Sequence, residues 1–182
     1  MKDREAAHHY GYSVNTFQGD MRDLGIFNSD AFDIVSQPYS LNFVPDCREV
    51  FQQVARVLKF GGLYSFWAAN PFAFGLGTKS WNGKAYELSS LYEQGQELQY
   101  EDESWVFPTG SSAPRPQGPR EYRQLLSTIL NGLIDQGFCL LHMREEAGHA
   151  ATDDWKLGEW DHFTAVMPPW FSFLARLNRK SD

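Results

Sequence analysis

The chain has 182 residues, which suits one domain and allows roughly 70% of the unfolded surface to be buried. Apolar residues make up 42% of the sequence and aromatic residues 15%, so a core can form, which argues against wholesale disorder. The net charge of −7 argues against a nucleic-acid partner, which would require a basic surface.

The start of the chain is predicted to be a helix followed by two strands. Residues 2–10 are predicted to be the last turns of a helix, and Gly11 is a plausible stop. Residues 14–17 are predicted to form a strand that ends in an acidic turn. Residues 31–37 contain a short apolar run (Phe32, Ile34 and Val35) that is typical of a strand buried between helices.

A second helix is predicted to begin after Asp46, which is a good N-cap, and Glu49 completes a capping-box pattern. Gly61 and Gly62 are predicted to end this helix, and residues 63–69 to form another buried strand. Apolar residues at helical spacing make one face of the helix: Val50, Phe51, Val54, Val57 and Leu58.

Residues 70–117 differ from the rest of the chain. They are rich in Gly, Ser and Pro, and acidic residues predominate, with no basic residue between Lys84 and Arg115. A connection of this length inside a domain is usually functional or disordered. The density of aromatic residues favours a folded lid or insert: Trp81, Tyr86, Tyr92, Tyr100, Trp105 and Phe107.

The last third returns to regular structure. A helix is predicted from Pro119 to Gly137, with an apolar stripe of Leu125, Leu126, Ile129, Leu130, Leu133 and Ile134. Residues 138–143 are predicted to form a strand, and residues 162–177 a Pro-Pro bend followed by a terminal strand. The alternation predicts an α/β fold, a single domain over residues 1–182 whose sheet has helices on both faces.

Cys47 and Cys139 lie in apolar patterns far apart in the sequence, and we interpret them as reduced core residues. Reduced cysteines, a charged N-terminal segment and the lack of a stretch of ~20 apolar residues predict a cytoplasmic protein with no membrane partner.

Three segments in order resemble a known family. "GDMRDL", "FDIVSQPYSLNFVPD" and "EVFQQVARVLKFGGLYSF" are similar to class I S-adenosylmethionine-dependent methyltransferases of the small-molecule, type 11 kind. The resemblance spans almost the whole chain and implies a Rossmann-like methyltransferase sheet. It also implies S-adenosylmethionine as the cofactor and a small molecule as the methyl acceptor.

The resemblance assigns cofactor contacts at two places. Asp20 takes the position of the acidic residue that meets the adenine amino group, and the backbone of Met21 would approach the adenine ring. The segment after the next strand would line the methionine end of the cofactor: Ser36, Gln37, Pro38 and Tyr39. A plain turn-forming role for Asp20 is the alternative, since a Gly-Asp pair also fits a turn.

The family's glycine-rich first motif and the acidic end of its second strand are not found upstream of residue 14. We therefore expect a fold that is truncated at the N-terminus. In the family's sheet order, 3-2-1-4-5-7-6, the first two strands separate the strand at residues 14–17 from the strand at residues 31–37. The latter would then present an apolar edge, through which the chain could form a homodimer.

Trp81 and Tyr86 are the predicted substrate contacts within the lid, because aromatic walls exclude water and favour cations. Covering the sheet edge is the alternative role for these rings. No metal site is predicted, because the spacing of the histidines and aspartates in the last third matches no ligand pattern: His142, His149, Asp153, Asp154, Asp161 and His162. No catalytic residue stands out, although His162 could serve as a general base.

The sequence thus predicts an S-adenosylmethionine-dependent methyltransferase acting on a small molecule, incomplete in this chain. Two alternatives remain open: a non-catalytic remnant that binds or dimerises, and an enzyme whose glycine-rich half is a separate polypeptide.

Overall fold

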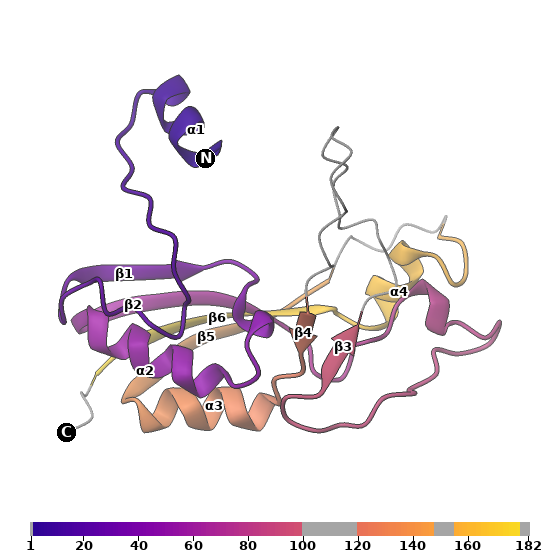
Figure 1. The fold of residues 1–182 in the computed structure, drawn as a ribbon. Helices are drawn as coiled ribbons and strands as arrows, with labels where there is room; N and C mark the ends of the chain where they lie inside the picture. The colour runs from indigo at the N-terminus through magenta and orange to yellow at the C-terminus, as the bar shows by residue number, and fades with distance from the viewer. Residues whose placement is uncertain (1, 100–119, 148–154, 179–182) are drawn as a thin grey trace.

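The computed structural model describes residues 2–99, 120–147 and 155–178 (Figure 1). Its main sheet has the order β1-β2-β6-β5. The strands are β1 (Phe32–Gln37), β2 (Leu58–Ala69), β5 (Phe138–Glu146) and β6 (Trp170–Leu177). β1 and β2 are parallel, and β6 is antiparallel to both of its neighbours. This order reproduces the last four positions, 4-5-7-6, of the sheet that the resemblance implies.

Helix α2 (Cys47–Val57) begins as the sequence predicts. Asp46 is its N-cap and accepts a hydrogen bond from the backbone N–H of Arg48, which satisfies a donor that the helix itself leaves unpaired. The predicted apolar face is buried. The helix ends earlier than predicted, however, because Leu58 already has an extended conformation and begins β2.

Gly61 and Gly62 therefore lie inside β2. The pairing with β1 is irregular here, since Phe32 is opposite Leu58 while Ile34 is opposite Leu63. Gly61 has φ +83°, and a Cβ at Gly62 would lie 2.9 Å from the carbonyl oxygen of Lys59. The two glycines thus accommodate the extra residues of β2 instead of ending a helix.

Helix α3 (Leu126–Asp135) packs beside α2 on one face of the sheet (Figure 1). Ile129 and Leu133 are fully buried, whereas Ile134 of the predicted stripe is 60% exposed. Gly137, with φ +81°, follows the helix as predicted. Pro119 lies outside the described residues, and β4 (Arg120–Tyr122) occupies the predicted first turn because these residues pair with the insert.

The core lies between these two helices and the sheet. Phe66 of β2 stacks on both Tyr64 of the same strand and Phe173 of β6, and Phe51 of α2 contacts Tyr64 and Phe66. The thiol of Cys47 is buried here, which raises its pKa to about 12. Cys139, in contrast, is exposed on β5, so the interpretation of both cysteines as core residues was wrong for this one.

The predicted cover of helices on both faces was wrong for the described residues. α2 and α3 cover one face of the sheet. On the side of the other face, α1 (Lys2–Tyr10) lies away from the sheet, at the end of an extended segment that we call the stalk (Figure 1). Ile34 is 62% exposed and Trp67 is 44% exposed, because no described helix packs on their side of the sheet. β1 is also an edge strand of the described sheet, as the resemblance implies.

The predicted strand at residues 14–17 is not formed. These residues belong to the stalk that follows α1, and Gly11 ends that helix with φ +71°. A strand requires a hydrogen-bonded neighbour, and none of the described strands pairs with this segment. Phe17 instead contacts Phe27, which in turn contacts Phe32 of β1.

The predicted lid, residues 70–117, is folded as far as Gln99, and residues 100–117 lie outside the described part. It contains a short β3 (Glu97–Gln99), which pairs with β4 in a two-stranded sheet. Helix α4 (Trp160–Val166), which sequence analysis missed, precedes the bend at Pro168 and Pro169. Among the described helices, none is both long and apolar enough to cross a membrane.

Candidate cofactor and acceptor site

The candidate site lies where the parallel strands β1 and β2 end. The residues that follow Asp20 and Met21 are held in place by the last turns of α2. The guanidinium of Arg56 donates to the backbone oxygens of Phe27 and Leu24, at 2.9 and 2.7 Å. The side-chain oxygen of Gln53 accepts from the N–H of Leu24 at 3.2 Å.

Met21 and Gln37 meet at the carboxyl end of β1. The Nε2 of Gln37 donates to the sulfur of Met21 at 3.3 Å, and its Oε1 accepts from the hydroxyl of Tyr64. Tyr64 is buried in the core, and burial raises its phenol pKa well above the usual value. The amide of Gln37 is therefore fixed from both ends, and it joins two of the segments that the sequence assigns to the cofactor.

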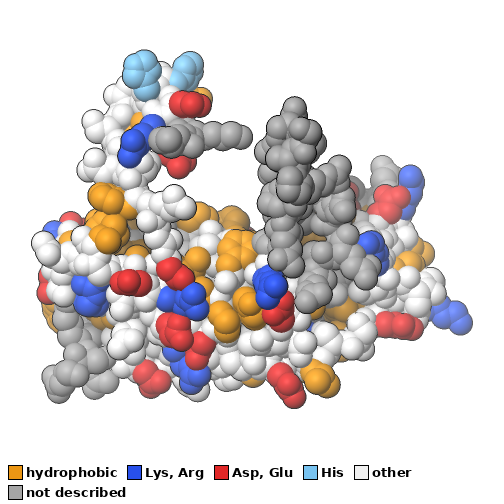
Figure 2. All heavy atoms as spheres, in the orientation of Figure 1, with side chains coloured by type: hydrophobic (Ala, Val, Ile, Leu, Met, Phe, Trp, Pro, Cys, Tyr) orange, Lys and Arg blue, Asp and Glu red, His pale blue; other side chains and the backbone are white. Residues whose placement is uncertain are grey.

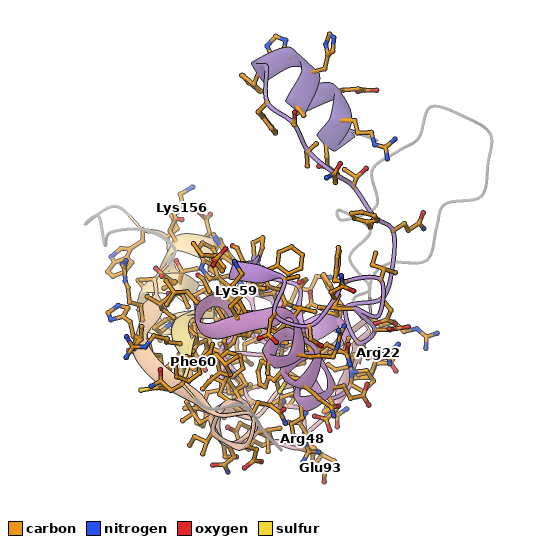
Figure 3. The ribbon with its side chains drawn as sticks, turned by 90° about the vertical axis from the view of Figure 1, so that its left-hand side faces the viewer. Arg22, Arg48, Lys59, Phe60, Glu93 and Lys156 are labelled. Atoms are coloured by element: carbon orange, nitrogen blue, oxygen red, sulfur yellow. The ribbon has the colours of Figure 1, made fainter. Side chains whose placement is uncertain are left out.

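Asp20 is ionised and engaged by Arg22. Its two carboxylate oxygens accept from Nε and Nη2 of Arg22, the shorter contact being 2.6 Å, and the backbone N–H of Arg22 donates to Oδ1 at 2.8 Å. These hydrogen bonds lower the carboxyl pKa to about 2. Both side chains are exposed, and Arg22 points away from the body of the protein (Figure 3).

The same kind of pair recurs at Asp46 and Arg48. On the face shown in Figure 2, basic and acidic side chains lie next to one another rather than in separate fields. An ion pair this exposed adds little stability, because water and salt screen it. The carboxylate of Asp20 is thus accessible to a ligand that displaces Arg22 or shares the carboxylate with it.

Tyr39 follows β1 in an unusual backbone conformation, with φ +23°. Such angles are costly for a residue with a side chain and occur often at functional sites. Its ring lies edge-on to Phe43 and Trp170, and its hydroxyl donates to Glu121 Oε2 at 3.0 Å. β4, which pairs with β3 of the insert, is thereby attached to the end of β1.

Asn42 and Arg123 strengthen that attachment. The side chain of Asn42, 1% exposed, accepts from the N–H of Ala69 and donates to the carbonyl of Tyr122. Arg123 is buried, and burial lowers its pKa. Its guanidinium donates to the carbonyl oxygens of Pro71 and Phe74, in the loop after β2, and to the hydroxyl of Ser90. It also lies over the rings of Phe74 and Tyr92.

Trp81 and Tyr86, the predicted substrate contacts, lie close together in an aromatic cluster at α4. Their rings are 5.0 Å apart, and the Tyr86 hydroxyl lies 2.8 Å from Nδ1 of His162, which also accepts from the Gly158 N–H. Burial raises the pKa of Tyr86. A continuous series of ring contacts connects this cluster to Tyr39 through Phe163, Trp160 and Trp170.

The remaining predicted residues of the site differ in their surroundings. Ser36 and Pro38 are exposed at the end of β1. His142 lies on β5, whereas His149, Asp153 and Asp154 are outside the described residues. Within residues 2–99, 120–147 and 155–178, no group of His, Cys, Asp or Glu is arranged to hold a metal ion.

Sequence analysis did not predict that Glu121 and Trp170 belong to the site. Glu121 fell within a segment predicted to be helical, so its pairing with β3 and its burial could not be recognised. Trp170 was assigned to the terminal strand correctly, but only the antiparallel pairing of β6 with β2 brings it to the end of β1.

The residues present fit the adenine end of S-adenosylmethionine by their chemistry. An ionised carboxylate at Asp20 accepts hydrogen bonds from an exocyclic amino group. The side chains of Gln37 and Tyr39 supply polar groups at the carboxyl edge of the sheet, where open α/β sheets bind their ligands. When bound, the sulfonium of this cofactor supplies the reactive methyl group.

Comparison with known proteins supports the same class. The family described as "Methyltransferase domain" matches residues 1–66. A curated relative from Bacillus subtilis (strain 168), the uncharacterized methyltransferase YbaJ, is 26% identical over 155 residues. That alignment covers 85% of this chain and 58% of the relative, so the chain spans little more than half of the relative's length.

Solved structures resemble the fold. A candidate S-adenosylmethionine-dependent methyltransferase from Listeria monocytogenes superposes with a TM-score of 0.64 at 15% identity, over 100% of this chain and 77% of that one. A second, from Mesorhizobium loti, gives 0.57 at 19% identity, over 96% and 76%. The resemblance to class I S-adenosylmethionine-dependent methyltransferases is confirmed, and the fold is their Rossmann-like α/β fold.

Proposed function

We propose that this chain binds S-adenosylmethionine at the carboxyl ends of β1 and β2 and takes part in methyl transfer to a small molecule. The observation that carries the proposal is the contact of Gln37 with Met21. Two segments that the resemblance assigns to the cofactor meet there. Asp20 directly precedes Met21 in the chain, and Tyr39 is two residues after Gln37.

The protein's own contribution is to orient and to exclude water. Asp20 and the backbone of Met21 bind the adenine end, while Ser36, Gln37, Pro38 and Tyr39 line the methionine end. The insert, held by Arg123, covers the acceptor side, with Trp81 and Tyr86 as acceptor contacts. A dry, aligned site is what a methyl transfer requires of its protein.

Calorimetric titration with S-adenosylhomocysteine tests the proposal. We expect binding in the micromolar range, and we expect Asp20→Ala to weaken it about 10- to 100-fold, which is typical of a lost hydrogen bond to a charged group. Asp33→Ala is the matched control, because Asp33 is also an exposed aspartate in an ion pair, with Lys59. Equal losses in both variants would contradict the assigned role of Asp20.

A non-catalytic binding protein is the second candidate. The engagement of Asp20 by Arg22 favours it, because the predicted adenine contact is already in an ion pair. The same titration separates the two candidates: a folded chain that takes up no S-adenosylhomocysteine supports the binding protein and refutes the methyltransferase.

A further inference from the structure

The outer edge of β1 has no neighbour among the described strands. β1 pairs with β2 on one side only. Proteins usually protect such an edge with lysine, proline or other charged residues, which keep a second chain from pairing with it. Residues 32–37 contain neither lysine nor proline, and their one charged side chain, Asp33, is paired with Lys59 of β2 at 2.8 Å. This edge is therefore suited to accept a further strand.

Residues 14–17 of the stalk have the opposite deficiency, because they are suited to a strand and pair with no described strand. Val14 and Thr16 are β-branched and Phe17 is aromatic, which favours an extended and paired conformation. Residues 11–19 carry no charge that would oppose pairing. Val14 and Phe17 are nevertheless 41% and 62% exposed.

The stalk has few contacts with the body of its own chain. The side chain of Arg4 in α1 donates to Thr16 of the stalk at 2.7 Å, so α1 is tied to the stalk itself. The ring of Phe17 lies 5.3 Å from that of Phe27, at the base of the stalk. Gly19 follows, and no atom lies within 4 Å of the place that a Cβ would take there. Since the stalk leads away from the sheet (Figure 1), a change of direction at Gly19 gives up little within the chain.

We propose that two copies of this chain exchange their stalks, so that residues 14–17 of each copy add as a strand to the outer edge of β1 in the other copy. Addition of an extended segment to an exposed sheet edge is a common mode of recognition. A second copy is the partner because both unpaired elements belong to this one chain, and a reciprocal exchange satisfies all four of them in a closed, two-fold dimer. This inference goes beyond the proposed function, because it concerns assembly and does not depend on the cofactor.

Proline in the stalk tests the exchange. The N–H groups of successive residues in a strand point to opposite sides, so either residue 15 or residue 16 must donate to β1 of the partner copy. The double variant Asn15→Pro, Thr16→Pro removes both donors. We expect the unaltered chain to be a dimer in light scattering, with twice the mass of the 20.9 kDa chain, and the proline variant to dissociate at least about tenfold more readily.

The matched control is Asn15→Ala, Thr16→Ala, which removes the same two side chains and keeps both N–H groups. It should remain a dimer. A monomeric unaltered chain would overturn the proposal, and so would a proline variant that dimerises as tightly as the alanine variant. Equal loss of the dimer in both variants would also refute pairing through the backbone.

Hydrogen exchange of the unaltered protein gives a second test that needs no substitution. Amide hydrogens within residues 14–17 should be protected at concentrations at which the chain is a dimer and should lose that protection on dilution to the monomer. Protection that is unchanged by dilution, or its absence in the dimer, would refute the exchange. Neither measurement uses S-adenosylhomocysteine, so the exchange and the proposed function succeed or fail separately.

Discussion

Gly132 tests how closely α2 and α3 pack. In the interior of a helix, replacing glycine by alanine usually stabilises a protein by up to about 1 kcal/mol, because alanine restricts the unfolded chain and favours the helix. At Gly132 the added Cβ would lie 2.9 Å from Cδ2 of Phe51 and 3.1 Å from Cγ of Arg48. The substitution therefore sets helix propensity against overpacking.

Overpacking should prevail. Phe51 is fully buried and contacts Tyr64 and Phe66, so its ring cannot move away from the new methyl group without disturbing the core. Inserting a methyl group into such a place costs about 1–3 kcal/mol. After the gain in helix propensity is subtracted, we expect Gly132→Ala to lower the free energy of unfolding by about 1 kcal/mol.

Urea unfolding followed by circular dichroism measures this change, and thermal unfolding should show a Tm about 2–4 °C lower. Asn131→Ala is the matched control, because the neighbouring side chain is exposed on the same helix and only its propensity changes. It should raise stability by a few tenths of a kcal/mol. If Gly132→Ala is as stable as the unaltered protein, the close approach of α2 and α3 is not a constraint and the reasoning fails.

Three further predictions concern the attachment of the insert, a helix cap and the sheet edge. Asn42→Ala should lower the free energy of unfolding by about 2–4 kcal/mol in urea unfolding, because it leaves a buried N–H and a partly buried carbonyl unsatisfied; a loss below 1 kcal/mol would contradict the role of this side chain. Asp46→Ala should cost about 1 kcal/mol at pH 7. Arg48 lowers the pKa of Asp46, so that this difference should be present above pH ~4 and fade as the pH falls through the lowered pKa; a pH-independent difference in Tm would refute it. Finally, we expect the chain to dimerise through the edge of β1. Light scattering should show that Ile34→Lys is a monomer, whereas Leu88→Lys, at an exposed apolar residue of the insert, remains a dimer. If the unaltered chain is a monomer, this interface does not exist.

The elements of the main sheet could be predicted where local signals agree. Asp46 begins α2 as an N-cap should, and apolar residues at helical spacing face the core. Gly137 follows α3 in a left-handed conformation. The order of the motifs also indicated the order of four strands, because each short apolar run in the resembled family has a known place in the sheet.

The site was only partly predictable. Met21, Gln37 and Tyr39 were assigned from the resemblance, and two of them are in contact. Glu121 could not be found, because an isolated glutamate in a polar segment has no periodicity to mark it. Its burial depends on a pairing between β3 and β4.

What the sequence by itself determined was the set of segments that must be buried and the turns between them, since periodicity, caps and glycines act over a few residues. Only the tertiary structure decided which segments find a partner. Residues 14–17 have the composition of a strand, yet no described strand pairs with them, while Gly61 and Gly62 join β2 because β1 lies beside them. Strand formation, burial of one face of the sheet and the meeting of Tyr39 with Glu121 are all contacts between residues far apart in the chain, and local sequence does not encode them.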